Sequence, residues 1–177
     1  RWSIKLIYRL LIKQNNGLLT YRKNNTNEMH FLIKSMKVIC SAHVGIIQRV
    51  SYIDQGNLED AIEACNKSVS IKPDYSDAHY TLGITLQELG KFDKSEASFR
   101  KAILLNPNHA EAYANLASIL KKFKMFEEAE TNYRKAIALK PDYFKFHYNL
   151  GLALKEFGRF EEAEACFKKT IMLKPDY

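Results

Sequence analysis

Residues 108–141 read NHAEAYANLASILKKFKMFEEAETNYRKAIALKP, and the same pattern occurs in residues 74–107 and 142–175. The chain has four prolines, each 34 residues from the next: Pro73, Pro107, Pro141 and Pro175. Each copy contains two helix-length stretches separated by a short break. A period of this length indicates an array of copies of one small helical unit.

The spacing of apolar residues predicts two amphipathic helices in each copy. In residues 142–175, for example, Leu150, Leu154 and Phe157 lie on one helical face. Gly56, Gly90 and Gly158 fall between the two halves of their copies, where a tight turn favours a residue that tolerates positive φ. Lys124 takes this place in the middle copy, so we expect a strained or differently shaped turn there.

Small residues recur on both predicted helices. On the first helices they are Gly83, Ala117 and Gly151, and on the second helices Ala61, Ser95, Ala129 and Ala163. Larger residues follow on three of the second helices: Phe99, Tyr133 and Phe167. We expect the small residues to let paired helices approach closely and the rings to fill the space beside them.

These motifs resemble the tetratricopeptide repeat family, whose unit carries aromatic, Leu-Gly, Ala, aromatic and Pro positions in this order. The resemblance is strong over residues 74–175 and extends to a degenerate unit at 42–73, whose first helix, 42–53, departs from the pattern. It implies an all-α fold, a right-handed α-solenoid of antiparallel helix pairs with about 3.5 to 4 units over residues 42–177. The expected units are 42–73, 74–107, 108–141 and 142–175.

Residues 1–41 form a separate basic segment with eight Lys or Arg and one Glu, whereas the remaining 19 basic and 19 acidic residues balance over 42–177. We interpret the segment as a helical cap on the array. A basic amphipathic helix over residues 1–13 for a membrane surface, and a leader that is not part of the natural protein, are the alternatives. Because the array is neutral, we expect no specific nucleic-acid partner.

The chain carries no motif for chemistry: it has no phosphate loop, dinucleotide-binding motif, Gly-x-Ser-x-Gly or His-Glu-x-x-His. His79 and His147 occupy equivalent sites two units apart, too far apart to share a metal ion. Cys40, Cys65 and Cys166 form no Cys-x-x-Cys pair, which favours reduced thiols in a cytoplasmic compartment. The repeat positions of Cys65 and Cys166 favour packing roles for these two. We therefore expect a protein that is not an enzyme, with no cofactor and no metal site.

Two acidic clusters lie at the same phase of successive second helices. They are Glu127, Glu128 and Glu130, and Glu161, Glu162 and Glu164. We interpret both as solvated residues that favour the start of a helix.

The resemblance implies a groove, lined by the first helices, that holds an extended peptide or a partner helix. The matching residues are Asp77, Tyr80, Thr81, Ile84, Gln87, Glu111, Ala114, Asn115, Ser118, Lys121, Lys145, Tyr148, Asn149, Leu152 and Lys155. Asn115 and Asn149 resemble the asparagine ladder of O-linked N-acetylglucosamine transferase repeats, and solvation of the inner surface is the alternative role for them. The clamp for chaperone tails is matched at Asn115 and Lys145 and departs elsewhere, so we disfavour that partner.

The predicted function is a non-catalytic scaffold for a protein or peptide partner. The alternative is the substrate-recruiting part of a larger glycosyl- or sulfotransferase-like enzyme. The sequence ends on the opening of a further repeat rather than on a polar cap, so we expect a fragment whose last helix leaves Ala163, Phe167 and Ile171 partly uncovered and favours self-association.

Overall fold

The computed structural model describes residues 58–176, which form seven α-helices and no strand. The helices are α3 (Leu58–Ile71), α4 (Ser76–Glu88), α5 (Phe92–Leu105), α6 (Ala110–Lys122), α7 (Phe126–Leu139), α8 (Phe144–Glu156) and α9 (Phe160–Leu173). All of them belong to one compact unit, Cys40–Tyr177. The expected cap, its boundary with the array, Gly56 and the helix at 42–53 lie outside the described residues.

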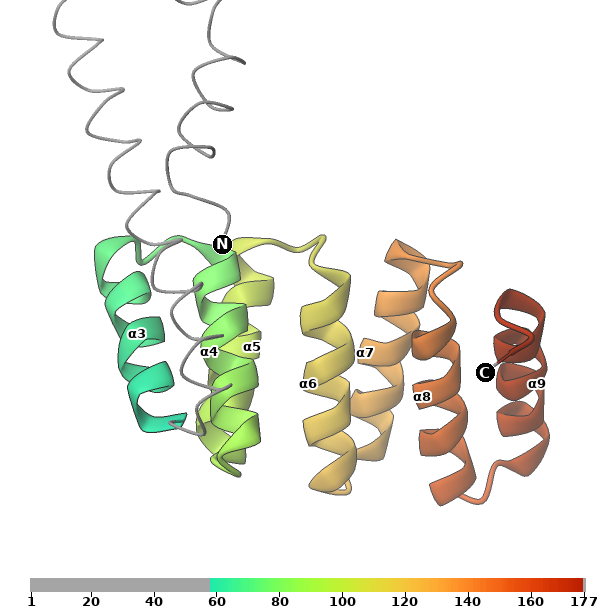
Figure 1. Ribbon diagram of the computed structural model, residues 1–177. Helices are drawn as coiled ribbons and strands as arrows, with labels where there is room; N and C mark the ends of the chain where they lie inside the picture. The colour runs from blue at the N-terminus through green and yellow to red at the C-terminus, as the bar shows by residue number, and fades with distance from the viewer. Residues whose placement is uncertain (1–57, 177) are drawn as a thin grey trace, which may run out of the picture. The chain divides into compact units, whose positions relative to one another are not determined.

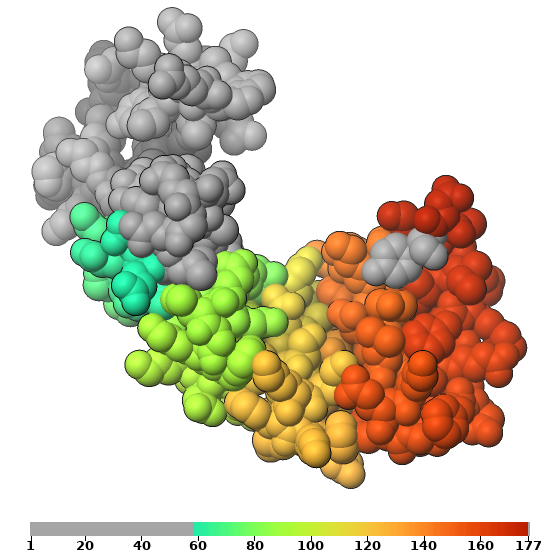
Figure 2. All heavy atoms as spheres, turned by 60° about the horizontal axis from the view of Figure 1, so that its bottom comes forward, coloured from blue at the N-terminus to red at the C-terminus, as the bar shows by residue number. Residues whose placement is uncertain are grey.

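The helices form antiparallel pairs that stack side by side (Figure 1). Helix α4 packs most extensively on α5, α6 on α7, and α8 on α9, and each pair then packs on the next through its second helix. In Figure 2 the pairs follow one another along a curved row, from green α4 through yellow α6 to orange α8. The all-α solenoid predicted from the sequence is thus confirmed.

Each pair is closed by the same tight turn. Gly90 and Gly158 have φ of 70° and 76°, and Lys124 adopts the same left-handed conformation with φ of 60°. The amide of Lys124 donates to the carbonyl of Lys121 at 2.9 Å, as the amide of Gly90 donates to Gln87 at 3.0 Å. The turn at Lys124 therefore keeps the shape of the glycine turns and is strained, because an L-residue disfavours this region.

Glycine and aromatic residues interlock within a pair, as the sequence predicted. A Cβ atom on Gly83 would lie 2.6 Å from the ring of Phe99, and one on Gly151 would lie 2.7 Å from the ring of Phe167. Phe99 is fully buried, whereas Phe167 is partly exposed. The rings thus lie directly against the backbone of the first helices, where glycine leaves room for them.

The buried residues form two clusters, one around Phe99 and Leu120 and one around Tyr133 and Leu154, and the signature leucines are unevenly buried. Leu116 and Leu150 are buried, each with 2% of its surface exposed. Leu82, the equivalent residue in α4, is only partly buried. A signature leucine therefore remains accessible between α3 and α5.

Helix α9 is more buried at one residue than the sequence predicted. Ala163 is buried with 3% exposure because it lies in the core cluster that contains Leu150 and Leu154 of α8, so its predicted exposure is wrong. Phe167 is partly exposed and Ile171 is 57% exposed, as predicted. Self-association through this face stays a prediction.

Within residues 58–176, every helix is too short or too polar to cross a bilayer.

Candidate functional site

The fifteen predicted groove residues all lie on the three first helices of the array. Five belong to each of α4, α6 and α8, and we call the surface that they form the first-helix face. Helices α6 and α8 contact each other directly, although α7 lies between them in the chain. The stacking therefore brings equivalent positions of successive units next to one another.

The asparagines of the first-helix face are both partly exposed. The Asn115 amide Nδ2 donates to the hydroxyl of Tyr80, at 3.3 Å, which links α6 to α4. Within the described part of the chain, the Asn149 side chain has no hydrogen-bond partner. Asn149 is therefore available to a ligand, and Asn115 is held in place by a neighbouring unit.

Two other predicted residues are less available than expected. The Thr81 hydroxyl donates to the Asp77 carbonyl within α4, at 2.6 Å, and only 7% of Thr81 is exposed. Ala114 is 4% exposed and forms part of the core. Both residues are therefore poorly placed to contact a ligand, because Thr81 is buried with its hydroxyl proton already donated and Ala114 has only a buried methyl group.

Charged pairs tie the first-helix face together at its edges. Lys121 of α6 forms an ion pair with Glu156 of α8, with Nζ 2.8 Å from Oε1. Lys140 likewise donates to the carboxylate of Glu111. Burial is the largest influence and would raise the pKa of Glu111, but the hydrogen bond from Lys140, a backbone hydrogen bond and the nearby positive charge together outweigh it and hold the pKa below its ordinary value.

The histidines of the array have structural partners. His79 Nε2 lies 2.8 Å from the carbonyl of Pro73, and His147 Nε2 lies 2.7 Å from the carbonyl of Pro141. His109 is the N-cap of α6, where its Nδ1 accepts from the amide of Ala112 at 3.4 Å. Residues 58–176 contain no cluster of three or more His, Cys, Asp or Glu that could hold a metal ion.

Two of the three cysteines lie in the described range, and both are free thiols in packed positions. Cys65 is fully buried, with Sγ 3.7 Å from the hydroxyl of Thr85. Cys166 packs partly buried against the core, and burial raises the pKa of its thiol. A raised pKa disfavours the thiolate of Cys166, and Cys65 is shielded from solvent, so both positions fit packing roles.

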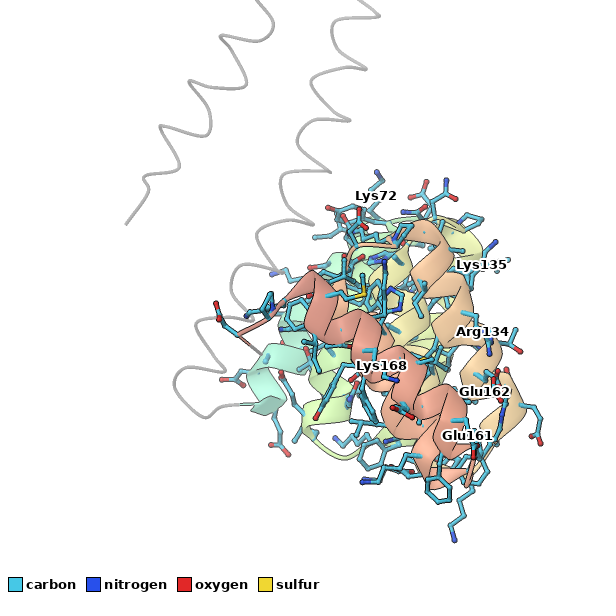
Figure 3. The ribbon with its side chains drawn as sticks, turned by 90° about the vertical axis from the view of Figure 1, so that its right-hand side faces the viewer. Lys72, Arg134, Lys135, Glu161, Glu162 and Lys168 are labelled. Carbon is cyan, nitrogen blue, oxygen red and sulfur yellow. The ribbon has the colours of Figure 1, made fainter. Side chains whose placement is uncertain are left out.

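The second helices carry a ladder of arginine and glutamate, which we call the second-helix ladder. Arg100 of α5 reaches Glu128 of α7, with Nη2 2.7 Å from Oε1. One unit further, Arg134 of α7 lies 3.5 Å from Glu162 of α9, and Figure 3 shows these two side chains together. An arginine on one second helix therefore bridges to a glutamate on the next.

Glu130 is the innermost acid of this ladder. The prediction that it is solvated is wrong. Its side chain is 17% exposed and accepts from both Arg134 and Arg159. Burial would raise the pKa of Glu130, but the hydrogen bonds from the two arginines outweigh it and hold the pKa below its ordinary value. Glu127 and Glu161, by contrast, are exposed in the first turns of α7 and α9, as expected.

Sequence reasoning missed the second-helix ladder. Its signal is present in the repeats, because Glu96 and Arg100 stand four residues apart and return as Glu130 and Arg134 in the next unit. Such a spacing predicts pairing within one helix. The bridges to the following second helix depend on how the units stack, and the spacing carries no information about that.

Family models of the tetratricopeptide repeat match the sequence over residues 52–120 and 144–177, and a model described as a TPR repeat matches residues 125–158. The chain belongs to the tetratricopeptide repeat family. No curated protein matches the chain.

Solved tetratricopeptide structures resemble this array. A crystal structure of MamA is 27% identical, with a TM-score of 0.70 over 76% of this chain and 79% of that chain. YrrB, described as a TPR protein with an unusual peptide-binding site, is 22% identical, with a TM-score of 0.68 over 77% of this chain and 71% of that chain, and this shows the fold alone. An O-GlcNAc transferase of Thermobaculum terrenum is 26% identical, with a TM-score of 0.61 over 66% of this chain and 22% of that chain.

Proposed function

We propose that this tetratricopeptide array is a non-catalytic scaffold that binds an extended peptide on its first-helix face. The observation that carries the proposal is the pair Asn115 and Asn149, which are partly exposed at equivalent positions of adjacent helices. An amide side chain offers a donor and an acceptor, as a peptide backbone does.

The spacing of the helices suits an extended ligand. Neighbouring packed helices are about 8–10 Å apart, and an extended chain advances about 3.3–3.6 Å per residue. Asn115 and Asn149 would therefore contact backbone groups about three residues apart. Because Tyr80 already holds Asn115, that side chain loses little conformational freedom on binding.

Peptide selection followed by titration tests this proposal. A display library of random twelve-residue peptides is selected on the wild-type chain, and the recovered peptides are labelled and titrated by fluorescence anisotropy. Two side-chain hydrogen bonds contribute about 1 kcal/mol each, so Asn115→Ala/Asn149→Ala is expected to weaken binding about tenfold to thirtyfold.

The matched control removes an exposed amide elsewhere. Asn108 lies in the turn before α6, and Asn108→Ala is expected to leave the affinity within about twofold of wild type. Circular dichroism checks that the helix content is unchanged in each variant. If the selected peptides bind the double variant as tightly as the wild type, the asparagines do not form the site.

A second candidate function is the recruitment of substrates for a larger transferase. The similarity to a 22% share of an O-GlcNAc transferase chain favours it, because that enzyme contains an array of the same kind. Sequencing the full transcript tests this candidate: a transferase domain encoded in the same reading frame would support it, and a stop codon directly after Tyr177 would exclude it.

We also propose a cytoplasmic location, based on the unpaired cysteines.

A further inference from the structure

The second-helix ladder is interrupted between α3 and α5. Glu96 and Glu130 are replaced at the equivalent position by Ile62, and Arg100 and Arg134 by Asn66. Neither replacement can bridge to the next second helix as an arginine does. The first groove between second helices therefore differs in chemistry from the two that follow.

The facing helix changes in the same groove. Lys94 of α5 stands where α7 has Glu128 and α9 has Glu162. Lys91 lies beside it, and in the described part of the chain neither ammonium group has a carboxylate partner. The positions that hold an arginine and an acid elsewhere thus hold Asn66 and Lys94 here, so that a carboxylate acceptor is missing.

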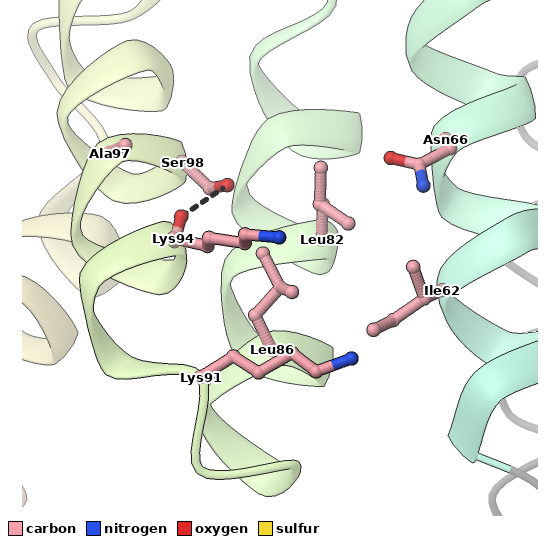
Figure 4. A pocket seen from close by; sticks show the side chains of 8 residues that line it. All are labelled: Ile62, Asn66, Leu82, Leu86, Lys91, Lys94, Ala97 and Ser98. Carbon is pink, nitrogen blue, oxygen red and sulfur yellow. Dashed lines mark hydrogen bonds between the residues drawn. The ribbon is translucent and has the colours of Figure 1, made fainter.

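A pocket of about 340 Å³ opens where the ladder is interrupted. Its floor is Leu82 and Leu86 of α4, and Ile62 and Asn66 of α3 face Lys94 of α5 and Lys91, the N-cap of α5, across it (Figure 4). Leu82 is partly exposed here, whereas its equivalents Leu116 and Leu150 lie buried. The size falls within the range of small ligand-binding pockets, about 300–1,000 Å³.

We propose that this pocket, the α3–α5 pocket, binds an acidic peptide segment by taking one aliphatic side chain on Leu82 and Leu86 and a carboxylate at Lys91 and Lys94. Charge decides the class of occupant, because two lysines without acidic partners favour an anionic ligand. Residues 1–41 of this chain carry eight cations and one acid, so they are a poor occupant. The site shares no residue with the first-helix face, and the proposal does not depend on the peptide site proposed there.

Binding requires both the carboxylate and the aliphatic side chain of the ligand. Charges on exposed groups are screened over about 8 Å at physiological salt, so two surface lysines alone give weak attraction. The apolar floor adds the burial of an aliphatic side chain, which salt does not screen. We therefore expect binding to need a leucine next to acidic residues.

The probe is a fluorescein-labelled synthetic peptide made of four Glu-Asp-Leu repeats. Fluorescence anisotropy at physiological salt measures its affinity for the wild-type chain. A peptide with every Leu changed to Ser keeps the charge, and one with every acid changed to its amide keeps the leucines. We expect each of these to bind at least tenfold more weakly than the parent peptide.

The decisive variant rebuilds the ladder that the other grooves contain. Ile62→Glu/Asn66→Arg/Lys94→Glu introduces the residue types of Glu96, Arg100 and Glu128, and it is expected to close the pocket and weaken binding at least tenfold. Lys135→Glu changes the net charge by the same amount on exposed α7 and is expected to bind within twofold of wild type (Figure 3). Asn115→Ala/Asn149→Ala is also expected to bind the probe normally.

A second variant guards against misfolding of the first. Lys91→Ala/Lys94→Ala alters two exposed side chains without ion pairs and is expected to fold normally and lose the probe. The proposal is overturned if the wild type does not bind at about 1 mM, if the Leu-to-Ser peptide binds equally, or if both pocket variants bind like the wild type. It is equally overturned if sedimentation shows that the pocket variants abolish a dimer of the wild type, since the occupant is then a second copy.

Discussion

Replacing Gly83 by Ala tests whether the close contact between paired helices is required. The new methyl group would lie 2.6 Å from the ring of Phe99, which is fully buried among Leu116, Leu120 and their neighbours. The ring has no exposed side toward which it can move. Gly151→Ala makes the same change against Phe167, at 2.7 Å, but this ring is partly exposed and can turn away.

The two substitutions separate the cost of crowding from the gain in helix propensity. Alanine stabilises a helix interior by about 0.8–1.0 kcal/mol relative to glycine. Extra atoms in a rigid core cost about 1–3 kcal/mol. We therefore expect Gly83→Ala to lower the free energy of unfolding by about 1–2 kcal/mol, and Gly151→Ala to change it by less than about 1 kcal/mol.

Urea denaturation followed by circular dichroism measures both variants. Because repeat arrays can unfold unit by unit, hydrogen exchange of the α4 and α5 amides provides a local measurement. The double variant Gly83→Ala/Phe99→Leu should lose less stability than the sum of its single changes, since the smaller side chain makes room. Equal effects of Gly83→Ala and Gly151→Ala, or a stabilised Gly83→Ala, would refute the account of the contact.

Two further predictions concern the turn and the ladder. Lys124→Gly should raise the free energy of unfolding by about 0.5–1 kcal/mol, measured by urea titration, because a strained left-handed residue is replaced by one that adopts φ of 60° freely; no gain would show that the turn is unstrained. Glu130→Gln should cost about 1 kcal/mol at pH 7. A carboxyl whose pKa is lowered by folding stabilises the fold above its unfolded pKa of about 4.3, and this contribution is lost as the pH falls through the lower folded value. The stability difference between wild type and Glu130→Gln should therefore shrink on acidification, and a gap that stays constant down to pH about 2 would contradict the role of the carboxylate.

The repeat register predicted the features that depend on local sequence. The positions of the helices, the glycine turns at Gly90 and Gly158 and the contact of Gly83 with Phe99 follow from which residues return every 34 positions, whereas for Lys124 the sequence left open whether its turn would be strained or differently shaped. The placement of the candidate groove residues on first helices follows in the same way. A tight turn between helices needs a positive φ, which glycine adopts most readily, so a glycine that returns at the same place in the repeat marks the turn.

The features that could not be predicted depend on long side chains or on neighbours across a groove. The Glu130 side chain can point to solvent or to an arginine, and its observed orientation depends on Arg159, which belongs to another unit. The Thr81 hydroxyl bonds back to its own helix, one of two arrangements that the sequence allows. Leu82 lines a pocket together with Ile62 and Asn66 of another helix, so no pattern within α4 alone predicts its exposure.

The interrupted ladder has a mechanical consequence. Arginine bridges join α5 to α7 and α7 to α9, whereas the positions that would join α3 to α5 hold Ile62 and Asn66. Under tension, we expect this joint to be more compliant than the α5–α7 and α7–α9 joints, so that pulling on the described part of the chain opens it before those later pairs separate. A partner that bridged α3 and α5 would stiffen this joint.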